Sequence, residues 1–71
     1  MTTKTLRVPD ISCEHCERTI RRALSRLDGV AAVEVDVPRK RVHVTYDEAL
    51  IGLEELEDAL LEEDYPVDSA I

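Results

Sequence analysis

The spacing of apolar residues along the chain alternates between the two periods that distinguish strands from helices. Three segments carry apolar residues at every second position, as strands with one buried face do, and two carry them three and four residues apart, as amphipathic helices do. In chain order the expected segments are a strand at residues 5–8, a helix at 13–27, strands at 30–37 and 41–46, a helix at 53–62 and a short strand at 66–71. Pro9 closes the first strand and Asp28-Gly29 ends the first helix.

This order of segments, strand–helix–strand–strand–helix–strand, predicts an α+β fold of the split βαβ, or ferredoxin-like, kind. The expected architecture is a βαββαβ sandwich, in which a four-stranded antiparallel sheet carries both helices on one face. Because 71 residues leave no room for a second core, we expect a single domain over residues 1–71.

Composition excludes several classes of function. Nine basic and sixteen acidic residues give a formal net charge of −7, and two tyrosines are the whole aromatic content. An acidic chain without aromatic stacking platforms is not expected to bind nucleic acid. The longest apolar run has four residues, far below the roughly 20 that span a bilayer, so no direct membrane insertion is expected. Since the N-terminal residues lack the apolar stretch of a secretory signal, we expect a cytoplasmic location.

Cys13-Glu14-His15-Cys16 is the one constellation of soft metal ligands in the sequence. It spans the expected loop and first helical turn, where backbone N–H groups and the positive end of the helix lower the pKa of cysteines and favour thiolates. The two intervening residues let both sulfur atoms face one point. Cys16 is in phase with the apolar stripe of the helix, so we expect it to be partly sheltered and Cys13 to be the more exposed of the two.

Two thiolates without hard ligands suit Cu(I), which accepts low coordination numbers. A structural zinc ion usually has four ligands, more than one copy of this chain offers at the motif. His15 is either an exposed residue of the loop or a third ligand, or a bridge in a metal-linked homodimer. An under-coordinated ion leaves a position that a partner's thiolate can enter, so this site favours stepwise transfer of the metal.

The basic residues of the first helix lie opposite its apolar face and beside the cysteine motif. All nine bases of the chain precede Tyr46, whereas ten acids and no base follow it. We expect Arg18, Arg21 and Arg22 to dock a partner by charge attraction, although a row of this kind is also typical of a solvated face.

The motif and its surroundings resemble the heavy-metal-associated domain family, in particular the small bacterial copper chaperones. Beyond residues 11–16, the resemblance covers nearly the whole chain and rests on Ile20, Ala23, Leu24, Leu27, Gly29, Val30, Leu56 and residues 33–35, 42–47 and 64–67. It implies a ferredoxin-like fold, Cu(I) held by Cys13 and Cys16, and delivery of the ion to the matching metal-binding domain of a copper-transporting P-type ATPase.

The resemblance also implies roles for residues around the cysteines. Ile11 stands where the family has a methionine that packs beneath the loop, and Ser12 directly precedes the first cysteine. Tyr65 corresponds to a tyrosine that lies beside the metal loop in bacterial members. Asp10 and Asp64 replace glycines that the family usually has at these positions.

The sequence therefore predicts a soluble Cu(I) chaperone that is not an enzyme. A protein of the same family that carries Zn(II), Cd(II) or Hg(II) is the first alternative, and a dithiol redox protein is the second. A copper-responsive repressor and a second, metal-bridged copy of the chain are further candidate partners. The chain offers no nucleophile and base with a third orienting group, which a hydrolytic enzyme would need.

Overall fold

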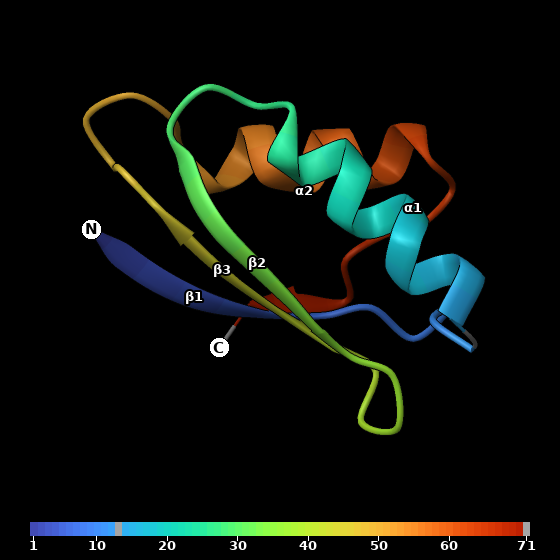
Figure 1. Cartoon of the computed structure of the whole chain (residues 1–71). Coiled ribbons are helices and arrows are strands. Elements are labelled where there is room, and N and C mark those ends of the chain that lie inside the picture. The colour runs from blue at the N-terminus through green and yellow to red at the C-terminus, as the bar shows by residue number, and fades with distance from the viewer. Residues whose placement is uncertain (13, 71) are drawn as a thin grey trace.

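The computed structural model describes residues 1–12 and 14–70, which form six elements in the predicted order. These are β1 (Thr2–Arg7), α1 (Glu14–Ser25), β2 (Val30–Asp36), β3 (Arg41–Tyr46), α2 (Leu53–Glu62) and β4 (Ser69–Ala70). The strands form one antiparallel sheet in the order β2-β3-β1-β4, and both helices cover the same face of it (Figure 1). The predicted ferredoxin-like βαββαβ sandwich is confirmed. Neither helix of the described residues is long and apolar enough to cross a membrane.

The core lies between the helices and the sheet, and every long element except β2 supplies it with completely buried side chains. These side chains are Leu6, Val8, Ile11, Ile20, Leu24, Val42, Val44, Leu56 and Leu60. Burying an aliphatic side chain of this size contributes roughly 1.5–3 kcal/mol. On the edge strand β2, Val35 is buried and Val33 is half-buried. Val37, directly after the strand, is also half-buried, and Val33 and Val37 both pack against the core.

The opposite face of the sheet carries polar side chains that pair across the strands. The hydroxyl oxygens of Thr3 and Thr45 lie 2.9 Å apart, and Thr5 Oγ1 lies 2.9 Å from Nδ1 of His43. The sequence predicts His43 as a surface residue of this polar face, and the structure places it there, half-buried by its neighbours.

Three boundaries differ by more than one residue from the sequence-based expectation. β1 begins at Thr2 rather than at residue 5, because its threonines pair with β3 in continuous register although they are not apolar. α1 ends at Ser25, and the chain continues in a tighter turn in which the Leu27 N–H donates to the Leu24 carbonyl at 3.1 Å. β4 is limited to Ser69–Ala70, which pair with Arg7 and Leu6 of β1, and the Asp68 N–H just before it donates to the Arg7 carbonyl at 2.8 Å.

Gly29 connects α1 to β2 in a conformation that other residues adopt only with strain. Its φ is +100°, and a Cβ atom at this position would lie 2.9 Å from Cγ2 of Ile51 and 3.0 Å from Cβ of Leu50. Both the backbone angle and the close approach of the loop before α2 therefore require glycine.

Candidate metal site

The segment that leads from β1 into α1 lies beside the segment that leads from α2 into β4. Pro9 and Asp10 from the first segment and Pro66, Val67 and Asp68 from the second line a common pocket of about 180 Å³. At this end of the molecule, α1 begins and α2 ends (Figure 1). The loop before the cysteine motif is thus adjacent to the residues that directly follow Tyr65.

Cys16 lies in the first turn of α1, where it is 7% exposed and belongs to the core cluster. Its Sγ atom lies 3.8 Å from the hydroxyl oxygen of Ser12. The prediction that Cys16 is sheltered by the apolar stripe of the helix is therefore confirmed. Cys13, predicted as its more exposed partner, lies outside the described residues.

Ile11 and Ser12 place the loop over the core. The Ile11 side chain is completely buried, and its N–H donates to the carbonyl of Val8 at 3.2 Å. This position agrees with an apolar anchor beneath the loop. Ser12 is exposed and lies two residues before the first described helical residue, with its hydroxyl near the sulfur of Cys16.

His15 is exposed and lies in the first turn of α1, within the helix expected at residues 13–27. Its carbonyl accepts a hydrogen bond from the Thr19 hydroxyl at 3.1 Å, within the helix. Among the described residues, which do not include Cys13, no group of three or more His, Cys, Asp or Glu side chains is placed to hold a metal ion.

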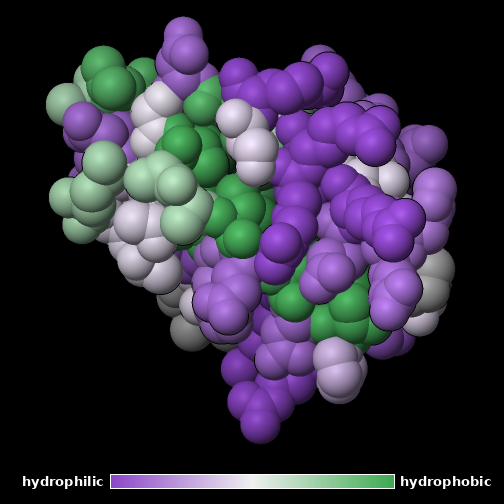
Figure 2. All heavy atoms as spheres, in the orientation of Figure 1, coloured by the Kyte–Doolittle hydropathy of each residue, from purple (hydrophilic) through white to green (hydrophobic). Residues whose placement is uncertain are grey.

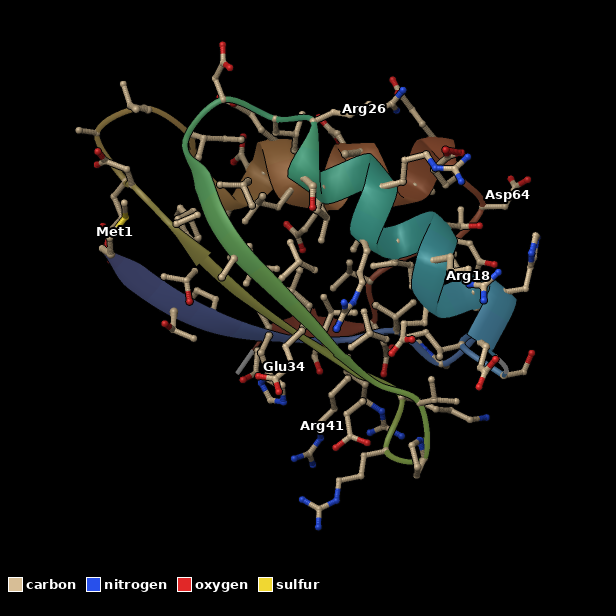
Figure 3. All side chains as sticks on the ribbon, in the orientation of Figure 1. Met1, Arg18, Arg26, Glu34, Arg41 and Asp64 are labelled. Atoms are coloured by element: carbon tan, nitrogen blue, oxygen red, sulfur yellow. The ribbon has the colours of Figure 1, made fainter. Side chains whose placement is uncertain are left out.

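Asp64 and Tyr65 follow α2 at the same end of the molecule. Asp64 has a φ of +65°, in the left-handed region, which explains why a glycine suits this position and why aspartate, one of the residues that tolerate this region, can replace it. The N–H of Tyr65 donates to the Leu60 carbonyl at 2.8 Å, and its half-buried side chain packs against the core. Figure 3 shows Asp64 and Arg18 at the end where α1 begins.

The exposed face of α1 carries the predicted row of arginines. Arg18, Arg21 and Arg22 are all exposed, and none of them forms an ion pair with a described residue. Figure 2 shows hydrophilic side chains gathered over this side of the molecule, next to a more apolar strip.

An acidic cleft beside the start of α1 is a feature that the sequence does not reveal. The cleft, of about 730 Å³, is lined by the carboxylates of Glu14, Glu17, Glu34 and Asp36, together with Val35, Val37, Pro38 and His43. The i, i+3 spacing of Glu14 and Glu17 puts them on one helix face, but only the tertiary structure brings that face against β2. The motif is therefore bordered by charges of both signs, and not only by the basic side of α1.

Taken together, the fold and the cysteine motif at the start of α1 define a small α+β domain of the metal-carrying type. The sequence matches the model of the heavy-metal-associated domain over residues 5–66. The chain belongs to this family.

Named relatives and solved structures agree with this assignment. A protein named copper chaperone CopZ from Staphylococcus haemolyticus is 36% identical over 67 residues, which cover 94% of this chain and 98% of the relative. The solved structure of a CopZ metallochaperone matches with a TM-score of 0.90 at 30% identity, covering 93% of this chain and 98% of that one. A copper binding domain from HMA7, a P-type ATPase, shares the fold with a TM-score of 0.91 at 20% identity over 96% of this chain and 92% of that one.

Proposed function

We propose that this chain is a Cu(I) chaperone, which binds one copper ion through the thiolates of Cys13 and Cys16 and passes it to a partner protein. The observation that carries the proposal is the position of Cys16 in the first turn of α1, sheltered by the core and next to the Ser12 hydroxyl. Similarity to copper chaperones over nearly the whole length of both chains supports it.

The start of α1 suits a thiolate site electrostatically. A Cu(I) ion with two thiolates carries a net charge of −1, and the positive end of a helix dipole stabilises such a charge. The Ser12 hydroxyl, at 3.8 Å from Sγ, can donate to the thiolate form of Cys16. The core behind Cys16 gives the sulfur atom a fixed position, so little reordering is needed when the ion arrives.

Transfer proceeds by exchange of thiolate ligands, with copper in the Cu(I) state throughout. A deprotonated cysteine of the partner forms a new Cu–S bond, and a bond from copper to one of the chain's own thiolates then breaks. The second exchange completes the transfer, and each released thiolate of the chain takes up a proton. Because Cu(I) accepts low coordination numbers, a position on the ion stays open, and the partner's thiolate can bind there before a thiolate of this chain leaves.

The proposed acceptor is the metal-binding domain of a copper-transporting P-type ATPase, since a copper binding domain of such an ATPase shares this fold. Arg18, Arg21 and Arg22 are proposed to dock it, because they are exposed, without ion pairs to described residues, and follow the motif on α1. A copper-responsive repressor is a second proposed acceptor. The exposed position of His15 is compatible with a metal-bridged homodimer.

We propose further that the carrier is cytoplasmic and has no catalytic activity. Residues 1–71 are proposed to form a single domain. Within this family, a site for Zn(II), Cd(II) or Hg(II) is the alternative. For Zn(II), it is supported by Asp10, which lines the pocket beside the loop and offers a carboxylate oxygen, a ligand that Zn(II) accepts. The dithiol redox alternative requires disulfide turnover without metal.

An anaerobic titration against a Cu(I)-selective competitor tests the proposal. We expect one tightly bound Cu(I) per chain, an affinity at least 100-fold lower for Cys13→Ser and Cys16→Ser, and an unchanged affinity for Ser25→Ala, a control at the exposed end of α1. Equal binding by the cysteine variants would overturn the assignment. Tighter competition by Zn(II) than by Cu(I) would favour the alternative.

A further inference from the structure

A second basic cluster lies where the end of β1 meets the turn between β2 and β3. It consists of Arg7, Arg39, Lys40 and Arg41, all exposed, and is called the hairpin basic patch below. The β1–β3 pairing sets Arg7 directly opposite Arg41, and the Val8 N–H donates to the Lys40 carbonyl at 2.9 Å. Figure 3 shows Arg41 at the hairpin end of the sheet, away from Arg18 and Arg26.

The patch departs from local structural preference in two ways. Arg7 and Arg41 are like charges directly opposite each other on neighbouring strands, an arrangement that destabilises a sheet. Lys40 has a φ of +57°, in the left-handed region, where glycine or asparagine is more favourable than lysine. Departures from local preference concentrate at functional sites, so both point to a use for these positive charges.

The ion pairs at the patch leave its cations available. Arg7 Nε lies 4.0 Å from Oδ2 of Asp68, and Arg39 Nε lies 3.9 Å from Oδ2 of Asp36. The arginine side chains in these pairs are 60% and 75% exposed, and exposed pairs of this length contribute little stability. An incoming carboxylate can therefore replace either partner. Lys40 and Arg41 form no ion pair with a described residue.

The backbone that presents the patch is already fixed. The Lys40 N–H donates to the Val37 carbonyl at 3.2 Å, and the Arg39 N–H donates to Oδ1 of Asp36 at 3.3 Å. Together with the bond from Val8, these contacts hold the turn at three points. Binding to such a surface orders only side chains, which lowers its entropic cost.

We propose that the hairpin basic patch binds a carboxylate-rich segment of a partner protein, through contacts separate from the metal site. Three of its four cations are arginines, whose planar guanidinium groups pair with carboxylates through two parallel hydrogen bonds. Asp36 and Asp68 border the patch, and the chain as a whole has a charge of −7. An extended polyanion would meet this negative surface beyond the patch, so a short acidic segment fits better than a nucleic acid or a lipid surface.

The test is a titration of the full-length chain with a synthetic hexaglutamate peptide, followed by the backbone amide resonances. We expect the largest shifts at residues 7 and 39–41, and weaker binding as salt increases. The variant Arg39→Gln/Lys40→Gln should lose at least fivefold in affinity, whereas the matched variant Lys4→Gln/Arg26→Gln, which removes two cations outside both proposed surfaces, should lose less than twofold. Larger shifts along α1, or equal loss in both variants, would overturn the proposal.

Two further measurements test which class of ligand the patch binds and whether it acts separately from the metal site. A short DNA duplex and phosphatidylglycerol vesicles, at equal charge concentration, are expected to bind more weakly than the peptide, and tighter binding of either would overturn the carboxylate assignment. The Cu(I) affinity of Arg39→Gln/Lys40→Gln is expected to equal that of the unaltered chain. A folded variant with reduced Cu(I) affinity would contradict the separation of the patch from the metal site.

Discussion

α1 and α2 pack against the same face of the sheet with similar buried stripes, but their exposed faces and their ends differ. α1 buries Cys16, Ile20, Ala23 and Leu24 and α2 buries Leu56 and Leu60. α1 exposes arginines and begins at the cysteine motif, whereas α2 has acids in its first turn, no base in its last turn, and ends near the same site. Packing therefore explains why both helices are present, and the difference in charge and in direction supports the proposal that the metal binds at the start of α1 rather than elsewhere on the helices.

Truncation of a buried leucine in each helix should lower the free energy of unfolding by similar amounts. Leu24→Ala in α1 and Leu56→Ala in α2 each remove a completely buried side chain, so each is expected to lower the free energy of unfolding by about 2–5 kcal/mol. Urea unfolding measures both. The exposed Leu61→Ala on α2 is the control, with an expected change within about 0.5 kcal/mol. A negligible effect at either buried leucine would refute equal packing.

The turns that precede β2 and α2 should differ in the same assay. Gly29→Ala places a Cβ atom at a φ of +100° and 2.9 Å from Ile51, so we expect a loss of about 1–3 kcal/mol. At Gly52, the cap of α2, an added Cβ meets nothing within 4 Å and φ is −107°. Gly52→Ala should change stability by less than about 0.5 kcal/mol, because a poorer cap and a stiffer unfolded chain offset each other. Similar losses at the two glycines would contradict this account of the turns.

The exposed faces should differ in metal transfer rather than in stability. The variant Arg18→Glu/Arg22→Glu on α1 is expected to slow Cu(I) transfer to an acceptor domain about tenfold at low salt, since charge steers association. Its Cu(I) affinity should be unchanged. The control Glu55→Lys/Asp58→Lys reverses two exposed charges on α2 and should not slow transfer. Stopped-flow transfer at several salt concentrations distinguishes the two faces, and equal rates for both variants would rule out docking by α1.

The smallest expected effect concerns the end of α2. Asp64 holds a left-handed φ of +65° that glycine adopts without strain, so Asp64→Gly should raise the free energy of unfolding by a few tenths to about 1 kcal/mol. Asp58→Gly, within the helix, should lower it by roughly 0.3 kcal/mol, because aspartate is itself a weak helix former. Thermal or urea unfolding of the pair provides the measurement. A loss of stability in Asp64→Gly would mean that the aspartate side chain stabilises the turn.

Much of the fold could be predicted from the spacing of apolar residues, because alternate and helical periods directly report which faces are buried. The order of elements and the shelter of Cys16 are consequences of that spacing, whereas the buried anchor at Ile11 was implied by the family resemblance. The first half of β1 was missed, since Thr2 and Thr3 form a strand through backbone pairing rather than through apolar alternation.

Features that depend on contacts between distant segments could not be predicted. The acidic cleft combines Glu14 and Glu17 of α1 with Glu34 of β2, and the opposition of Arg7 to Arg41 depends on the strand register. Sequence spacing is silent on both, because it reports the periodicity within a segment and not which segments meet. The positive φ at Lys40 was equally hidden, as lysine gives no signal of a left-handed turn.

The central claim is that copper is held by the sulfur atoms of Cys13 and Cys16 at the start of α1. X-ray absorption at the copper edge, on the anaerobically loaded full-length chain, tests it most directly. The account predicts a Cu(I) edge with sulfur-only ligands at a coordination number of two to three, and loss of this signature in Cys16→Ser. Oxygen or nitrogen ligands as the main shell, or an unchanged spectrum in Cys16→Ser, would contradict it.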